Sequence, residues 1–207
     1  MRIGVYGGSF DPVHVGHLVV AECCREQAGL DRVLFVPAAV PPHKRDRLLA
    51  AADHRVDMLR LATGGHDAFA VSTAEVDRGG VSYTADTLVS LAMTHPGDQL
   101  LLILGPDALA DLPTWHAPDR VVAAAEIIAV ERAGIDDVPA LLREPRLAAL
   151  LGTDVAARVA AARVRVPPIG IRASELRAAV AAGRSIRYRT PRAVELHIRS
   201  HGLYRPS

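Results

Sequence analysis

The chain has 207 residues, a length between one and two typical domains, so a single core can bury most of its apolar surface. Lys and Arg total 24 against 23 for Asp and Glu, and the resulting net charge of +1 gives no basic surplus for nucleic acid. No apolar run approaches the ~18 residues of a membrane span, and the N-terminus lacks the pattern of a signal peptide. We therefore expect a cytoplasmic protein with neither nucleic acid nor membrane as a partner.

Apolar runs and helical patterns alternate along the first two thirds of the chain. The runs are short and fully apolar at their centres, which is typical of parallel strands covered on both faces. The expected strands are residues 2–6, 32–37, 69–72, 99–105 and 126–132. The expected helices are residues 18–28, 53–62, 83–93 and 119–125. This alternation predicts an α/β fold with a doubly wound parallel sheet.

The C-terminal third is mostly helical. Residues 136–162 are rich in Ala, Leu and Arg, residues 163–168 form one more short strand, and helices are expected at 174–182 and 191–200. We find no repeat and no low-complexity linker. The chain is therefore predicted to be a single domain over residues 1–207, with a sheet core over 1–166 and a helical C-terminal extension over 167–207.

The two cysteines, Cys23 and Cys24, are adjacent within an expected helix. Their side chains diverge there, so we expect no disulfide between them, and the spacing fits no metal site. We interpret both as thiols in or near the core and predict no metal-ligating residues.

The stretch VYGGSFDPVHVGH, from Val5 to His17, joins the first expected strand to the first expected helix. In a doubly wound sheet, the first such turn usually borders the ligand crevice. Its glycines fit neither the dinucleotide fingerprint nor the P-loop. Glycines do allow backbone N–H groups to approach an anion, and the start of the following helix adds to the attraction.

His14 and His17 are three residues apart at this helix start, so both rings can lie on one side. Two imidazoles beside backbone N–H groups are suited to phosphate oxygens whose charge grows in a transition state. Glycines in turns and single histidines are common without any function. Their combination within eleven positions favours a functional site over a simple turn.

The stretch GGSFDPVHVGH closely resembles the signature of the HxGH nucleotidyltransferases. The rest of the chain is similar to one branch of them, the bacterial nicotinate mononucleotide adenylyltransferases. The matching segments are PPHK (41–44), SYTADTL (82–88), GPDALADLPTWH (105–116) and IRYRTPRAVELHIRSHGLY (186–204). Each segment alone is a weak signal, but their order and content make the resemblance specific over nearly the whole chain.

The resemblance implies a Rossmann-like enzyme of NAD biosynthesis that transfers AMP from ATP to nicotinate mononucleotide, releasing pyrophosphate and forming deamido-NAD. It implies Mg²⁺ carried by the ATP phosphates, without a dedicated protein ligand. The catalytic residues would be His14 and His17. The expected ATP-binding residues are Gly7, Gly8, Ser9, Phe10, His14, His17, Gly105, Asp107, Arg172, Ser174 and Arg177. The expected substrate-binding residues are Ser9, Phe10, His43, Lys44, Thr84, Trp115, His116 and Arg132.

Some of these residues also have a purely structural interpretation. Asp107 could be the N-cap of a helix over residues 108–112 as readily as a ligand of adenosine. Trp115, the sole tryptophan, would stack on the nicotinate ring, or it packs its loop onto the surface without contacting a ligand. Backbone N–H groups near Thr84 and His116 would receive the carboxylate of the nicotinate. His43 and Lys44 would form a basic clamp for the substrate phosphate, whereas Arg45 is better interpreted as solvated.

One segment departs from the family pattern. A turn rich in Ser and Thr, followed by arginine, is replaced here by Arg172-Ala173-Ser174-Glu175-Leu176-Arg177. Arg177 matches the family's arginine, and Ser174 keeps a hydroxyl that could cap the helix and touch a phosphate. Arg172 either replaces the missing hydroxyl contacts to ATP or points to solvent.

Three alternatives remain open from the sequence. Another HxGH transferase, such as a pantetheine-phosphate adenylyltransferase or a cytidylyltransferase, would share the first motif. A dinucleotide-dependent oxidoreductase would need a glycine spacing that this chain lacks. The third alternative is a protein that has kept the fold and binds nucleotides but catalyses no reaction. The sequence leaves homo-oligomerisation undecided.

Overall fold

A computed structural model describes residues 1–41 and 49–205. Its core is a six-stranded sheet with the order β3-β2-β1-β4-β5-β6. The strands are β1 (Arg2–Gly8), β2 (Arg32–Pro37), β3 (Phe69–Val71), β4 (Gln99–Leu104), β5 (Glu126–Arg132) and β6 (Val164–Val166). The pairs β1–β4, β4–β5 and β5–β6 are parallel, with Val5 opposite Leu102 and Leu104 opposite Ala129. The order reverses between β1 and β4, as in a doubly wound Rossmann-like sheet.

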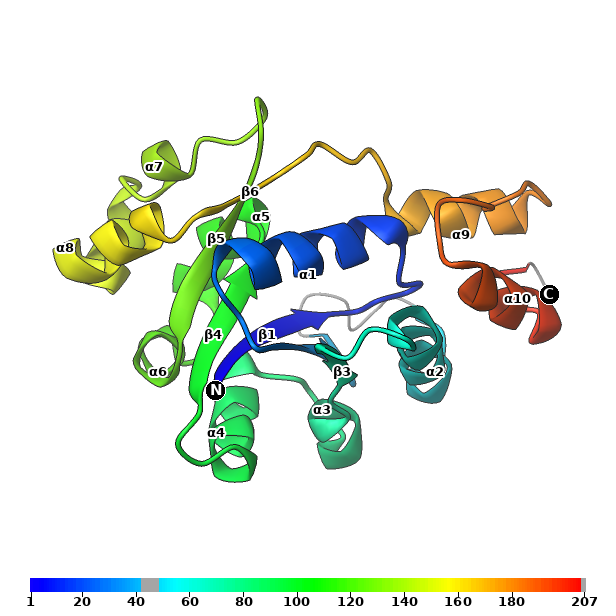
Figure 1. The fold of residues 1–207 in the computed structure, drawn as a ribbon, viewed down its shortest axis with the longest axis horizontal. Coiled ribbons are helices and arrows are strands. Elements are labelled where there is room, and N and C mark those ends of the chain that lie inside the picture. The colour runs from blue at the N-terminus through cyan, green and yellow to red at the C-terminus, as the bar shows by residue number, and fades with distance from the viewer. Residues whose placement is uncertain (42–48, 206–207) are drawn as a thin grey trace. The chain divides into compact units, whose positions relative to one another are not determined.

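Helices connect the strands, as Figure 1 shows. Before β4 these are α1 (Val15–Gln27), α2 (Ala52–Thr63), α3 (Ala74–Arg78) and α4 (Thr84–Thr94). Between β4 and β6 they are α5 (Pro106–Asp111), the 3₁₀ helix η2 (Leu112–Thr114), α6 (Pro118–Ala124), α7 (Val138–Leu141) and α8 (Pro145–Ala161). After β6 come α9 (Ala173–Ala181) and α10 (Arg192–Ser200).

The doubly wound α/β class predicted from the alternation is confirmed, and each expected strand and helix is present within a few residues. The structure adds α3, a helix of five residues, and resolves residues 136–162 into two helices, α7 and α8. Cys24 is buried, Cys23 is half-buried and both are free thiols, as expected. None of the helices described is both long enough and apolar enough to cross a membrane.

The chain forms two compact units that interleave along the sequence. Unit 1 comprises residues 1–6, 20–34 and 83–168, and unit 2 comprises residues 7–19, 35–82 and 169–207. Because these units do not follow the predicted division at residue 166, that division stays a prediction.

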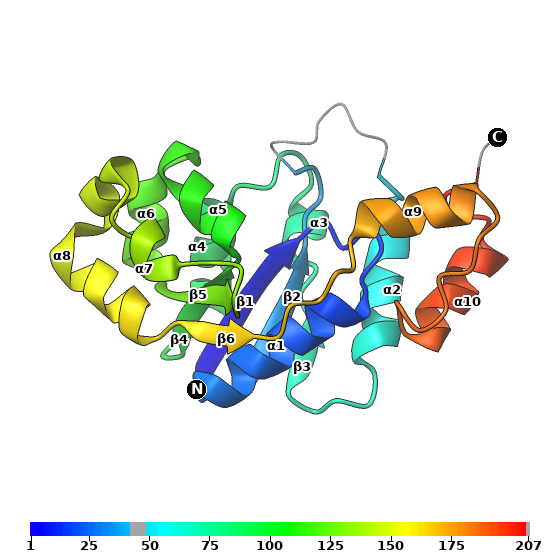
Figure 2. The same ribbon diagram turned by 90° about the horizontal axis from the view of Figure 1, so that it is seen from above.

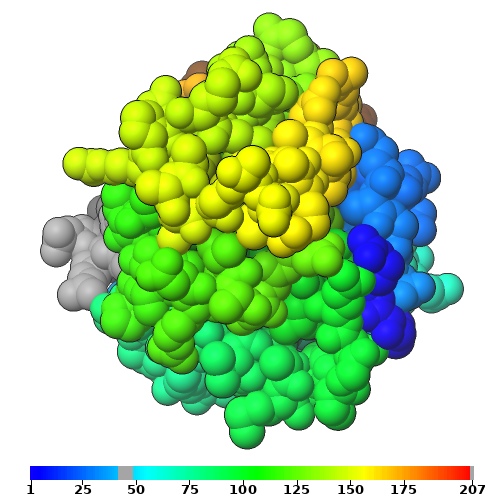
Figure 3. Space-filling model, turned by 90° about the vertical axis from the view of Figure 1, so that its left-hand side faces the viewer, coloured from blue at the N-terminus to red at the C-terminus, as the bar shows by residue number. Residues whose placement is uncertain are grey.

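In unit 1, β4 and β5 form the apolar centre, and their middle residues are almost fully buried. A Cβ at Gly4 of β1 would lie 2.6 Å from the Leu30 side chain and 3.1 Å from that of Ile103, so a larger residue here would force the Leu30 side chain to shift. Figure 3 shows one face, on which the yellow surface of α8 adjoins the green surface of α6.

Unit 2 contains residues 7–19, which include the turn after β1, together with β3 and the helices α2, α9 and α10. Phe35 and Phe69 make an edge-to-face contact with ring centroids 5.3 Å apart. Helices α2 and α10 lie side by side, which Figure 2 also shows. Their shared interface brings residues near position 54 to the C-terminal end of the chain.

Candidate active site

The glycine-rich turn after β1, residues 7–17, lies in unit 2 and is called here the motif loop. Gly8 is the last residue of β1, and its carbonyl accepts a hydrogen bond from the Ala38 N–H at 2.9 Å. Phe10 then adopts a left-handed backbone with φ of 47° and buries its ring. A Cβ at Gly8 would approach that ring to within 3.0 Å, so the glycine allows the chain to fold back over Phe10.

His14 and His17 meet at the start of α1, as predicted. Their rings stack with centroids 3.7 Å apart and planes inclined by 25°. The backbone N–H of His14 donates to Nδ1 of His17 at 3.2 Å. Because Nδ1 accepts this bond, the neutral His17 ring carries its proton on Nε2, which can donate to a phosphate oxygen. The ring of Phe10 meets His17 edge-on at 5.1 Å and helps to fix its plane.

Gly16 has a specific reason to be glycine. A Cβ at this position would lie 3.1 Å from both Cε1 and Nδ1 of the His14 ring. Such a contact is tighter than ordinary van der Waals packing, so a larger residue would displace the imidazole. The glycine of the H-x-G-H pattern therefore makes room for the first histidine of the same pattern.

His14 is only 7% exposed, and burial lowers its pKa to about 4. Desolvation disfavours the charged imidazolium, so the ring is neutral at physiological pH. Within residues 1–41 and 49–205, its Nδ1 is buried without a hydrogen-bond partner. A buried polar atom of this kind is uncommon in folded proteins and is typical of functional sites.

Asp11 anchors the motif loop from inside and is 2% exposed. Its Oδ1 accepts from the Tyr204 hydroxyl at 2.6 Å and from the Ala50 N–H at 3.2 Å. Arg177 donates to the Asp11 carbonyl at 2.7 Å and lies 3.5 Å from its carboxylate. Burial, together with the charge of Asp11, raises the pKa of Tyr204, so the phenol keeps its proton and remains the donor.

Arg55 holds the loop from a second side and is 1% exposed. Its guanidinium donates to the carbonyls of Ser9 at 3.0 Å, Ala50 at 3.0 Å and Ala39 at 3.2 Å. Thr190 completes the support by donating to the Val13 carbonyl at 2.8 Å. Sequence reasoning missed these positioning residues. The sequence offered one signal for Arg55, a charged residue among the buried apolar positions of α2.

In unit 1, α4 begins at Thr84, so its first N–H groups lie at the positive end of the helix. The Tyr83 ring lies against that of His116, with centroids 4.3 Å apart. The segments around Thr84 and His116 therefore lie close together, as the sequence predicted. Trp115 follows η2 and is partly exposed. Its backbone N–H donates to the Leu112 carbonyl at 3.1 Å.

Asp107 does not cap a helix. Helix α5 begins at Pro106 with Gly105 in the N-cap position, so Asp107 falls inside the first turn and is exposed. Proline suits the first helical position, because its φ is helical and it has no N–H that needs a hydrogen-bond acceptor. The helix therefore begins at Pro106, one residue before Asp107. The N-cap interpretation of Asp107 is therefore wrong.

Arg132 ends β5, as expected, but its guanidinium already has an anionic partner in unit 1. Its Nε and Nη2 each lie 2.8 Å from one carboxylate oxygen of Asp136. These hydrogen bonds raise the pKa of Arg132 and lower that of Asp136, and the charge of Asp107 contributes to the shift of Arg132. Its contact with a substrate phosphate stays a prediction.

Helix α9 begins at Ala173, with Arg172 in the N-cap position and without a side-chain cap. Ser174 thus lies in the first turn and is exposed, so the expectation that it caps the helix is wrong. The extended backbone of Arg172, with φ of −123° and ψ of 136°, starts the helix earlier than the sequence suggested. Arg172 is also exposed. The predicted residues His43 and Lys44 lie outside the described residues, as does Arg45.

The doubly wound sheet and the H-x-G-H loop define a class of nucleotide-binding transferases. In agreement, the model of the cytidylyltransferase-like family matches residues 5–179. The chain is 45% identical over 207 residues to a probable nicotinate-nucleotide adenylyltransferase of Salinibacter ruber, covering 100% of both chains. It is 44% identical over 204 residues to the protein of that name from Thermomicrobium roseum, covering 99% of this chain and 92% of the relative. The chain belongs to this family of nicotinate-nucleotide adenylyltransferases.

The fold is also found among solved structures. The nicotinic acid mononucleotide adenylyltransferase of Plasmodium falciparum, complexed with NaAD, superposes with a TM-score of 0.76 at 19% identity. The alignment covers 98% of this chain and 97% of the other. A second structure of that protein, complexed with APC, gives a TM-score of 0.74 at the same identity and covers 98% and 96% of the two chains. At this identity the similarity establishes the fold alone.

Proposed function

We propose that this chain transfers the AMP group of ATP to nicotinate mononucleotide, forming deamido-NAD and pyrophosphate. The observation that carries the proposal is the stacked His14–His17 pair, which presents Nε2–H of His17 at the start of α1. Its family relatives carry the name of the same activity. The cytoplasmic location expected from the sequence stays a prediction.

The reaction requires positioning more than acid–base chemistry. A phosphate oxygen of nicotinate mononucleotide attacks the α-phosphorus of ATP in line, and the bond from that phosphorus to the bridging oxygen breaks. Pyrophosphate leaves with the electron pair of that bond, so no protein nucleophile is needed. Negative charge grows on the phosphate oxygens, and Nε2–H of His17 and the ring of His14 would donate to them. Mg²⁺ that arrives with ATP would neutralise part of the same charge.

The other site residues take their roles from the resemblance. Backbone N–H groups of Gly7 to Phe10 would approach the phosphates, and Gly105 and Asp107 would contact the adenosine side. Arg172, Ser174 and Arg177 would contact the ATP phosphates. Trp115 would stack on the pyridine ring, and Arg132, His43 and Lys44 would bind the phosphate of the mononucleotide.

Recognition of the carboxylate would come from main-chain donors near Thr84 and His116. A carboxylate oxygen only accepts hydrogen bonds, whereas a carboxamide would aim its own NH₂ group at one of these donors. The start of α4 adds a positive potential that favours the acid. A pocket that leaves polar groups unpaired with the wrong ligand discriminates strongly. We therefore expect a preference for the acid of about 100-fold or more in kcat/KM.

The test is pyrophosphate release from ATP with nicotinate mononucleotide, nicotinamide mononucleotide or phosphopantetheine as acceptor. Release with nicotinate mononucleotide at least ~100-fold more efficient than with the amide would support the proposal. Comparable rates with the amide would overturn the acid-specific interpretation. Release with phosphopantetheine alone would assign a different transferase, and release with none would indicate a binding protein.

A further inference from the structure

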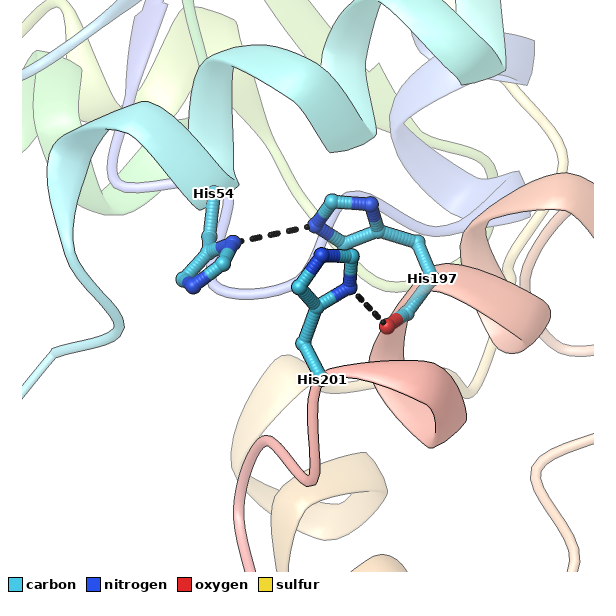
Figure 4. A group of neighbouring side chains, drawn as sticks. All are labelled: His54, His197 and His201. Atoms are coloured by element: carbon cyan, nitrogen blue, oxygen red, sulfur yellow. Dashed lines mark hydrogen bonds between the residues drawn. The ribbon is translucent and has the colours of Figure 1, made fainter.

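Three histidines outside the motif loop gather within unit 2, and Figure 4 shows them facing one another. His54 belongs to the first turn of α2, and His197 belongs to α10. His201 occupies the C-cap position of α10, four residues after His197. Residues at i and i+4 lie on one face of a helix, so both imidazoles of α10 point toward α2. His54 and His197 are partly buried, and His201 is exposed.

The distances between the rings match those around a metal ion. Nδ1 of His54 and Nε2 of His197 are 3.2 Å apart. Zinc–nitrogen bonds of about 2.0–2.1 Å at tetrahedral angles separate two ligand nitrogens by about 3.3 Å. One nitrogen from each of the three rings lies within 4.8 Å of the other two. A small rotation of the exposed His201 ring would bring its nitrogen to the same separation.

The structure also fixes which nitrogen His201 can offer. Its Nδ1 lies 2.9 Å from the carbonyl oxygen of His197. A carbonyl only accepts, so Nδ1 carries the proton and Nε2 carries the lone pair in the neutral ring. Metal-bound histidines typically donate their second N–H to a carbonyl or carboxylate in this way, which orients the ring.

One carboxylate, which lies 3.6 Å from the Arg60 guanidinium, is also near the cluster. Asp57, one turn after His54 in α2, is close enough to act electrostatically on His197. Three imidazoles without a thiolate suit Zn²⁺, with a water molecule in the fourth position.

We propose that His54, His197 and His201 form a Zn²⁺ site that joins α10 to α2. Helix α2 and the segment that follows α10 also support the motif loop. Arg55, next to His54, binds the Ser9 carbonyl, and Tyr204, three residues after His201, binds Asp11. The ion would thus stabilise the native packing of the C-terminal segment, and binding to the folded state raises the melting temperature by mass action.

The test uses the full chain without an affinity tag, freed of metal by a chelator and then dialysed against Zn²⁺. We expect one Zn²⁺ per chain and a Tm that is higher with Zn²⁺ than with chelator. Co²⁺ in place of Zn²⁺ should give the intense visible absorption of a tetrahedral site. Both His197→Ala and His201→Ala should weaken Zn²⁺ binding by at least ~10-fold, since each removes a ligand.

His95→Ala is the matched control, because His95 lies at the end of α4 in unit 1 and should leave the affinity unchanged. His201→Ala removes an exposed ring, so it keeps the test valid if His197→Ala fails to fold. The proposal is overturned if the wild type binds no stoichiometric Zn²⁺. It is equally overturned if both cluster variants bind Zn²⁺ as tightly as the control, because the His54–His197 contact would then be only a hydrogen bond.

Discussion

At the scale of single residues, His17 carries the clearest chemical role. Its Nδ1 accepts a hydrogen bond from the His14 N–H, so the neutral ring carries its proton on Nε2. We expect His17→Ala to lower kcat by about 100-fold or more, because a donor aimed at developing charge is lost. The measurement is steady-state pyrophosphate release, with His66→Ala as a control outside the motif. Turnover within a factor of a few of the wild type would contradict this role.

Gly16 permits a sharper test of geometry. Gly16→Ala adds one methyl group, which would meet the His14 ring at 3.1 Å. Alanine is a better helix former than glycine, which offsets part of the cost of this close contact, so stability should change little. We nevertheless expect kcat to fall by about 10- to 100-fold, since small displacements of catalytic groups are costly. Thermal unfolding and kinetics measured on the same sample separate the two effects, and an unchanged kcat would count against the steric explanation.

His14 links this loop to the pH dependence of stability. Its folded-state pKa of about 4 lies below the usual 6.5. Between these two values the unfolded chain binds a proton that the folded chain does not, so the free energy of unfolding decreases as pH falls through this window. Urea unfolding between pH 7 and about 4 should show a smaller decrease for His14→Ala than for the wild type. Parallel pH profiles for the two proteins would exclude a buried neutral ring.

At the scale of elements, the motif loop depends on hydrogen bonds from distant segments. Tyr204→Phe removes the hydroxyl that reaches Oδ1 of Asp11 at 2.6 Å. Leaving a buried carboxylate short of a donor should lower the free energy of unfolding by about 1–3 kcal/mol. Tyr188→Phe is the control, because Tyr188 is 84% exposed and its change should stay within about 0.5 kcal/mol. Equal stability of the two variants in urea unfolding would show that the Asp11 contact is unimportant.

The sequence predicted the elements that carry local patterns. The central strands are apolar throughout, and the helices α2 and α4 follow clear apolar periodicities, so both kinds of element were recognised. Helix α3 was missed because five residues are too few to show a period. The capping errors at Asp107 and Ser174 arose at helix boundaries, where one residue of shift changes the role of a side chain.

The candidate site was predicted only where its residues are neighbours in sequence. His14 and His17 share one turn, so their stacking could be anticipated. The Tyr204–Asp11 bond joins residues 193 positions apart, and the His54–His197 contact joins residues 143 apart. Such pairs arise from tertiary packing, which leaves no trace in local patterns. For this reason sequence reasoning found neither Arg55 nor Tyr204.

At the scale of the whole molecule, the interleaved units share their secondary structure. β1 is divided between the units after Tyr6, α1 after Val19 and β2 after Leu34. Neither unit can unfold without breaking elements of the other, so we expect one cooperative transition. Fluorescence of Trp115, which lies in unit 1, and far-UV circular dichroism of the whole chain should give the same urea midpoint. Two separated midpoints would indicate that the units unfold independently.

The hydrogen bond between Tyr204 and Asp11 also has a consequence for biosynthesis. The ribosome makes Tyr204 193 residues after Asp11. At about 5–20 residues per second, the nascent motif loop waits roughly 10–40 s for this donor. Translation products that stop before Tyr204 would emerge with a complete H-x-G-H sequence but without the hydroxyl that secures it. Such products would therefore hold the motif loop less tightly than chains that include Tyr204.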